Sequence, residues 1–315
     1  MRTLICGSIA YDTIMVFNGH FKDHILPEQV HILNVAFLVP EMRREFGGCA
    51  GNIAYNLKLL GGDPVPMATV GSDAAPYLAR LDALGIERSQ VRQVEDSYTA
   101  QAFITTDLAD NQITAFHPGA MNFSEQNHVA AAAAPGQPVK LGIVAPDGRA
   151  GMLQHAREFA AAGIPFIFDP GQGLPMFNGA ELLAFIDLAR WVAVNDYEAK
   201  LLCERTGQSP EQLARRVAAL IITRGAAGST IYAGGKIHEI PCAPATTLAD
   251  PTGCGDAYRG GLLYGIAHGM DWITAGRLAS TMGAIKIASK GPQNHEPSRA
   301  EIAEVFKSAY GGAPW

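Results

Sequence analysis

The segment with the clearest chemical meaning is Asp250-Pro-Thr-Gly-Cys-Gly-Asp256, which is followed at once by the helical run Ala257–Ala267. Its glycines predict a turn that opens a helix. The first N–H groups of a helix lack acceptors within the helix, and the helix dipole places about half a positive charge there. We therefore expect the amides of Gly253, Cys254 and Gly255 to bind an anion, such as the terminal phosphate of a nucleotide.

Asp256 lies on the first turn of this predicted helix. Its carboxylate can reach a hydroxyl group held against the bound phosphate and accept its proton as a general base. The loop amides would stabilise the negative charge that spreads over a phosphoryl group during transfer. Because an aspartate in the first turn of a helix is also common on dipole grounds alone, the whole heptapeptide, and not Asp256 by itself, predicts phosphoryl transfer.

Two other phosphate-binding patterns are absent from the sequence. The pattern G-x-x-x-x-G-K-[ST] has no match, since Lys236 follows Gly235 but Ile237 comes next. No G-x-G-x-x-G opens a helix after the first predicted strand, Thr3–Ile9. The predicted phosphate site is therefore neither a P-loop nor a dinucleotide-binding turn.

From about residue 140 onward, short apolar runs alternate with longer helical ones, which favours a mostly parallel sheet with helices on both faces. Several predicted strands end in a polar residue, at Asp169, Asn195 and Thr223. Ligands of such sheets bind at the carboxyl ends of the strands. The predicted strands are 141–145, 165–169, 191–195, 220–223 and 229–233, and the predicted helices are 149–162, 179–189, 196–206, 210–219, 255–269, 272–288 and 298–309.

The N-terminal part differs, because strands follow one another there without intervening helices. We expect two inserted β segments, 13–40 and 97–117, to form a small sheet that covers the carboxyl edge of the main sheet as a lid. The main domain would then comprise residues 1–12, 41–96 and 118–315. The strands expected for the lid are 13–17, 30–39, 97–106 and 112–116, and a helix is expected at 51–60.

The heptapeptide resembles the D-T-x-G-A-G-D signature of the ribokinase-like (PfkB) carbohydrate kinase family, with Pro251 and Cys254 as departures. The resemblance implies the family fold, a central sheet between helices with a β lid, which agrees with the strand pattern. Further matches follow in the family's order: Gly7-Ser8 with Asp12, Gly47-Gly48-Cys49-Ala50-Gly51-Asn52, Asn195-Asp196-Tyr197-Glu198, and Thr223-Arg224-Gly225 with Gly228.

The resemblance also implies roles on the acceptor side. Asp12, Gly48 and Asn52, with Gly47 beside them, would bind hydroxyl groups of the acceptor, while Asp256 would be the base. Each residue has a structural alternative: Asp12 is also a common turn former, the glycine pair can simply open a helix, and Asn52 can be a surface amide of that helix.

On the nucleotide side, the resemblance implies that Thr223, Gly225 and Gly228 contact ATP. Asn195 and Glu198 would position Mg²⁺ through water, although Asn at a strand end and Glu in the next helical turn are favoured without any ligand. Family members also often place a monovalent cation, such as K⁺, beside the turn at 250–252, which the residues themselves do not establish.

The acceptor is predicted from the lid. Ribokinase-type members carry Asn two residues before the aspartate, where this chain has Ala10, and the lid strands are apolar and aromatic. A nucleobase suits such walls better than a free sugar does, although Phe103 and Phe116 could simply be the buried face of the lid. The run 112–121 also resembles adenosine and nucleoside kinases of the family. We favour a 5′-kinase for adenosine, inosine or guanosine, with ribokinase or another sugar kinase as the alternative.

Composition bounds the class of protein. A net charge of −6 over 315 residues leaves no basic surface for nucleic acid. No apolar run approaches the ~18 residues that span a membrane, and five cysteines without metal-ligand spacing predict reduced thiols in a cytoplasmic protein.

An exposed lid edge could pair two subunits as a homodimer. A non-catalytic sensor on the same fold is disfavoured because Asp256 and both loop glycines are present.

Overall fold

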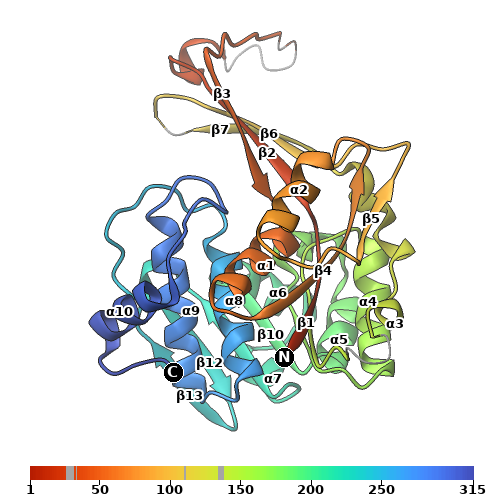
Figure 1. Ribbon diagram of the computed structural model, residues 1–315, viewed down its shortest axis with the longest axis vertical. Helices are drawn as coiled ribbons and strands as arrows, with labels where there is room; N and C mark the ends of the chain where they lie inside the picture. The colour runs from red at the N-terminus through yellow and green to blue at the C-terminus, as the bar shows by residue number, and fades with distance from the viewer. Residues whose placement is uncertain (26–31, 33, 110, 134–137) are drawn as a thin grey trace.

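The computed structural model describes residues 1–25, 32, 34–109, 111–133 and 138–315. It contains a nine-stranded sheet in the order β13-β12-β11-β10-β9-β8-β1-β4-β5 and a four-stranded sheet in the order β3-β2-β6-β7, which we call the lid sheet. Figure 1 shows the lid sheet rising from the larger α/β body. The predicted fold class, a mostly parallel sheet between helices with a small second sheet, is confirmed.

The large sheet is parallel from β11 through to β5, and β12 and β13 add an antiparallel edge. Its inner strands are mostly apolar and buried, as expected for strands covered on both faces, whereas the two edge strands, β5 and β13, are more polar and exposed. They are β1 (Arg2–Cys6), β4 (Asp63–Gly71), β5 (Val91–Val94), β8 (Leu141–Val144), β9 (Phe166–Phe168), β10 (Trp191–Asn195), β11 (Ala219–Thr223), β12 (Ser229–Ala233) and β13 (Lys236–Ile240).

Helices cover both faces of this sheet, and each face has its own hydrophobic core. Along β1 the side chains alternate, so that Ile5 packs into one core and Leu4 and Cys6 into the other. None of the helices in the described residues is long and apolar enough to cross a membrane. The helices are α1 (Cys49–Leu59), α2 (Ala75–Ala83), α3 (Val129–Ala132), α4 (Arg149–Ala161), α5 (Gly179–Leu188), α6 (Asp196–Thr206), α7 (Pro210–Ala214), α8 (Cys254–Ala267), α9 (Trp272–Ile287) and α10 (Arg299–Tyr310).

The lid sheet consists of β2 (Ala10–Val16), β3 (Glu41–Gly47), β6 (Ala100–Thr106) and β7 (Gln112–His117). Two predictions about it are corrected. Residues 34–39, part of the strand expected at 30–39, form no strand, while residues 30, 31 and 33 lie outside the described residues. The strand lies instead at β3. The first lid segment, predicted at 13–40, therefore begins at residue 10 and ends at residue 47. The charged sequence of β3 resembles a loop, but β3 is an edge strand, and pairing with β2 satisfies the backbone groups on its inner side.

Candidate active site

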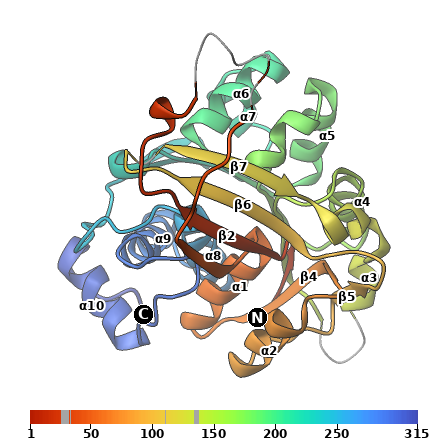
Figure 2. The same cartoon turned by 90° about the horizontal axis from the view of Figure 1, so that it is seen from above.

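A cavity of ≈ 700 Å³ lies between the lid sheet and the carboxyl ends of the central strands. Figure 2 shows β6 and β7 crossing above the α/β body on this side. Asp12 and Ala102 line the cavity from the lid sheet, and Asp169 and Asn195 line it from the ends of β9 and β10. The polar strand ends therefore meet under the lid sheet, as the sequence predicts.

The heptapeptide forms the predicted turn and helix start. Gly253 is the N-cap of α8 with a φ of 80°, a left-handed conformation that favours glycine. At Gly255, a Cβ would meet no atom within 4 Å, so this backbone faces open space. The N–H of Cys254 already donates to the carbonyl of Pro251 at 3.1 Å. Among the described residues, the N–H groups of Gly253, Gly255 and Asp256 have no protein acceptor, and these amides are left for an anion.

Asp256 is held by a chain of buried polar groups. Asn52 Nδ2 donates to Asp256 Oδ2 at 2.8 Å, and Gln293 Nε2 donates to Asn52 Oδ1 at 2.9 Å and to Tyr77 Oη at 2.8 Å. The Tyr77 hydroxyl in turn donates to the carbonyl of Gly47 at 2.8 Å. Burial raises the pKa of Asp256 to about 7, against the opposing hydrogen bond from Asn52. A carboxyl that titrates near neutral pH is suited to accept a proton.

Asp12 lies on β2, in the lid sheet, and not in the main domain, to which residues 1–12 were predicted to belong. Among the described residues no hydrogen bond engages its carboxylate, which lines the cavity. Burial, followed by the charges of Asp250 and Glu45, raises the pKa of Asp12 to about 6. A carboxylate without a protein partner in a cavity is available to ligand hydroxyl groups.

The two glycines before α1 have different reasons to be glycine. A Cβ on Gly47 would lie 2.5 Å from Asp12 Oδ2, so Gly47 makes room for that carboxylate. Gly48 has a φ of 87°, and its Cβ would lie 2.6 Å from the N of Ala10 and from the O of Ser8. Gly48 lines the cavity, whereas Gly47 does not.

The two aromatic residues predicted to form the wall, Phe103 and Phe116, lie on opposite faces of the lid sheet. Phe116 on β7 pairs with Ala102, whose other neighbour is Asp12, so these three side chains share the cavity face of the lid sheet. Phe103 pairs with Thr13 and belongs to the opposite face. Phe103 does not line the cavity, and its predicted role as a wall is not supported.

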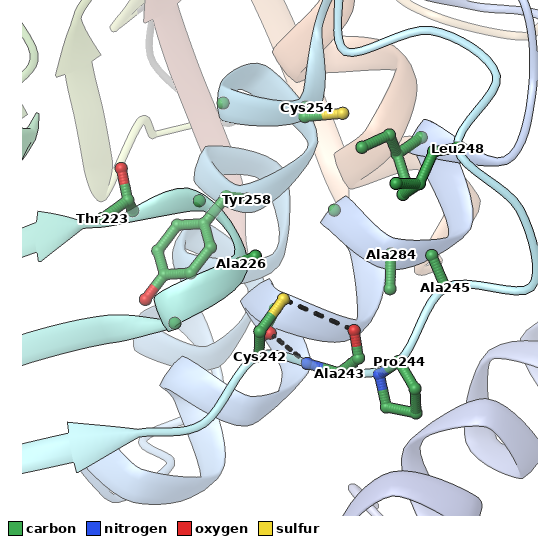
Figure 3. A pocket seen from close by; sticks show the side chains of 16 residues that line it. Thr223, Ala226, Cys242, Ala243, Pro244, Ala245, Leu248, Cys254, Tyr258 and Ala284 are labelled. Carbon is green, nitrogen blue, oxygen red and sulfur yellow. Dashed lines mark hydrogen bonds between the residues drawn. The ribbon is translucent and has the colours of Figure 1, made fainter.

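A second cavity, of ≈ 410 Å³, lies beyond the turn. Figure 3 shows it between Tyr258, Leu248 and the segment 242–245. Its lining is mostly small and apolar and includes Gly225 and Gly228. Thr223 and Gly255 line both cavities. An apolar cavity, a set of free amides and a polar cavity with a buried carboxylate thus follow one another in space.

Asn195 and Glu198 form a capping box at the start of α6. Glu198 N donates to Asn195 Oδ1, Asn195 N to Glu198 Oε2 and Asn195 Nδ2 to Glu198 Oε1, each at 2.8 Å. Burial and then the charge of Asp169 raise the pKa of Glu198. The pair therefore has a structural role at the start of this helix, and both residues also line the polar cavity.

Sequence reasoning missed a buried ion pair in the same cavity. Arg259, one turn after Asp256 on α8, donates through Nε and Nη2 to the two carboxylate oxygens of Asp169 at 3.1 and 3.0 Å. The charge of Asp169 raises the pKa of Arg259 against the effect of burial. Arg259 is the only charged residue in the segment 257–267, which otherwise consists mainly of small and apolar residues. This isolated charge was the signal in the sequence from which a buried ion pair could have been suspected.

Comparison with known proteins places the chain. The sequence matches the pfkB family carbohydrate kinase profile over residues 13–299. The chain belongs to the pfkB family of carbohydrate kinases. This kinase is 32% identical over 275 residues to a nucleoside kinase of Methanocaldococcus jannaschii, covering 86% of this chain and 88% of the relative. The family predicted from the heptapeptide is confirmed.

Solved structures agree. A nucleoside kinase of Burkholderia thailandensis, in complex with inosine, is 61% identical to this kinase, with 99% of each chain covered and a TM-score of 0.89. The structure of that enzyme with ADP-inosine is 63% identical, with 99% of this chain and 97% of the other covered and a TM-score of 0.87. The predicted resemblance to nucleoside kinases within the family is confirmed as well.

Proposed function

We propose that this kinase transfers the γ-phosphoryl group of ATP to the 5′-hydroxyl of a nucleoside, with Asp256 as the general base. The observation that carries the proposal is the meeting of two cavities at the free amides of Gly253, Gly255 and Asp256, beside a buried carboxylate. The apolar cavity suits the adenine of ATP, and the polar cavity suits the acceptor. The similarity to nucleoside kinases, one of them solved with inosine, supports a nucleoside as that acceptor.

The proton and the phosphoryl group move in opposite directions across the site. The 5′-oxygen bonds to the γ-phosphorus, its proton passes to Asp256, and ADP leaves with the electrons of the broken P–O bond. Asp12 and Asn52 bind the ribose hydroxyls, which orients the 5′-oxygen toward the phosphorus. The amides of Gly253 and Gly255 stabilise the charge on the transferred group.

Mg²⁺ belongs to this proposal, since amides alone do not neutralise a triphosphate. Among the described residues no three His, Cys, Asp or Glu side chains are grouped to hold a metal. Mg²⁺ usually keeps several waters and is bound by one or two carboxylates and the phosphates, which fits Glu198 as a single carboxylate acting through water. The ion would supply positive charge to the phosphates. EDTA should therefore abolish activity, and Mg²⁺ or Mn²⁺ should restore it.

A nucleobase gains from the end of the cavity beyond the ribose. Phe116, Pro118 and Met121 line the cavity, and we propose that the base lies against them. Burial of one face of a purine removes on the order of 100 Å² of surface, worth roughly 2 kcal/mol, or about 30-fold in kcat/KM. Free ribose gains none of this, so the same hydroxyl contacts serve it less well.

The outer face of the lid sheet carries exposed Met42, Phe103 and Ile113, and we propose that a second copy of the chain covers it in a homodimer. Analytical ultracentrifugation that finds only a monomer at micromolar concentration would contradict this homodimer.

All five cysteines are free thiols, which favours a reducing, cytoplasmic compartment.

The test of the acceptor is a steady-state comparison of ATP consumption with inosine, adenosine, guanosine, ribose and fructose. We expect a purine nucleoside to exceed both sugars by at least about tenfold in kcat/KM. A higher kcat/KM for ribose or fructose would replace the nucleoside assignment with a sugar kinase.

A further inference from the structure

Lys286 is buried without a carboxylate partner. It lies in the last turn of α9, and its side chain is 0% exposed. Its ammonium donates to the backbone carbonyls of Asp250 at 2.8 Å and Ser289 at 3.0 Å. Among the described residues it forms no ion pair. Because burial of a charged group is costly, such a lysine calls for an explanation.

The ammonium joins the turn before the free amides to the end of α9. Asp250 begins that turn, and its carboxylate accepts from the N–H groups of Thr252 and Gly291, each at 2.9 Å. The N–H groups of residues 249 and 250 donate to the carbonyl of Ile287 at 2.8 and 3.1 Å. Lys286 adds a positive charge between these two segments, at the negative end of the α9 dipole.

This arrangement leaves no room for the monovalent cation expected beside the turn at 250–252. K⁺ is bound in proteins by several carbonyl oxygens that replace its hydration shell. Here the carbonyls of Asp250 and Ser289 already accept from an ammonium. A second cation at the same oxygens would lie a few ångströms from that charge and be repelled. The residues present do not fit K⁺.

We propose that the Lys286 ammonium takes the place of a monovalent cation and positions the turn that carries the free amides, so that the kinase needs no K⁺. Burial lowers the pKa of Lys286, and the charge of Asp250 opposes this effect. Because the ammonium is covalently attached, its position does not depend on salt concentration. Lys286 is a positioning residue, since it acts on the transferred phosphate only through the turn.

The inference rests on the proposed function, and its first test uses the wild-type enzyme. Phosphorylation of inosine is measured with sodium salts of ATP and MgCl₂ at constant ionic strength in KCl, NaCl or tetramethylammonium chloride. We expect kcat to agree within about twofold in all three. Stimulation by K⁺ of about fivefold or more would overturn the inference. No activity in any salt would instead contradict the proposed function.

The second test removes the ammonium. Lys286→Ala opens the space beside the two carbonyls, and we expect kcat to fall by about 10- to 100-fold, with K⁺ or NH₄⁺ restoring part of it. Lys286→Met fills that space without a charge, so its kcat should fall by the same factor, and neither K⁺ nor NH₄⁺ should restore it. The Kd of inosine, measured by calorimetry, should stay unchanged in both. Lys290→Ala, at an exposed lysine four residues on, is the matched control. Wild-type kcat in folded Lys286→Met would contradict the role.

Discussion

The two cavities of the active site are built in different ways. The apolar cavity is formed mainly by two continuous stretches, 223–228 and 242–258, with part of α9. The polar cavity takes residues from both sheets and from segments spread between Ser8 and Arg259. The apolar cavity and the amides beside it, which form the nucleotide side of the site, are therefore specified by local sequence. The polar cavity, which forms the acceptor side, depends on how distant segments pack. Substitutions on the nucleotide side should affect every acceptor equally, while those on the acceptor side should discriminate between acceptors.

The largest effect is expected at the boundary between the cavities. Asp256→Asn keeps the size of the side chain and removes the proton acceptor, so kcat with inosine should fall by about 10²- to 10⁴-fold. The Kd of inosine and the melting temperature should stay close to wild type, which calorimetry and thermal unfolding can check. More than half of wild-type kcat, with chemistry shown to limit the rate, would refute the role.

A comparable loss is expected from blocking the amides. Gly255→Val places a branched side chain in open space where the phosphate would bind. Since a Cβ at this position meets no atom within 4 Å, we expect the fold to persist while kcat/KM falls by about 10²- to 10³-fold, the cost of losing one such donor. The loss should be the same for inosine and ribose. Gly255→Ala is the matched smaller change and should retain more activity; equal kcat/KM in all three proteins would contradict the assignment.

The smallest effect, and the one that separates the cavities, concerns the acceptor. Phe116→Ala should lower kcat/KM for inosine by about tenfold and leave ribose nearly unchanged, because only the base contacts this wall. Phe103→Ala is the matched control, since Phe103 lies on the other face of the lid sheet. Equal losses for inosine and ribose in Phe116→Ala would show that the side chain acts only on the fold of the lid.

The elements that could be predicted from sequence are those whose signals are local. The heptapeptide, α8 and the alternating strands after residue 140 are of this kind. The strand β4 was missed because Pro64 and Pro66 argue against a central strand. In the structure β4 pairs with β1 over residues 63–67 and with β5 only over 68–71, so both prolines lie where one side of β4 has no paired strand.

The parts of the site that could not be predicted depend on contacts between distant residues. Gln293 bonds to Asn52 across 241 residues, and Arg259 pairs with Asp169 across 90. No spacing in the sequence records either contact. Asp12 was predicted to be a site residue from its place in the family pattern, but its position within the lid sheet was not predicted.

The pH dependence of phosphoryl transfer tests the central assignment most directly. Asp256 must lose its proton to act as a base, and its pKa is raised to about 7. Single-turnover rates of inosine phosphorylation, measured by rapid quench from pH 5 to 9, should therefore fall about tenfold per unit below pH 7 in the wild-type enzyme. In Asp256→Asn the rate should be low and lack this acidic limb. An acidic limb near pH 7 that persists in Asp256→Asn would show that another group accepts the proton.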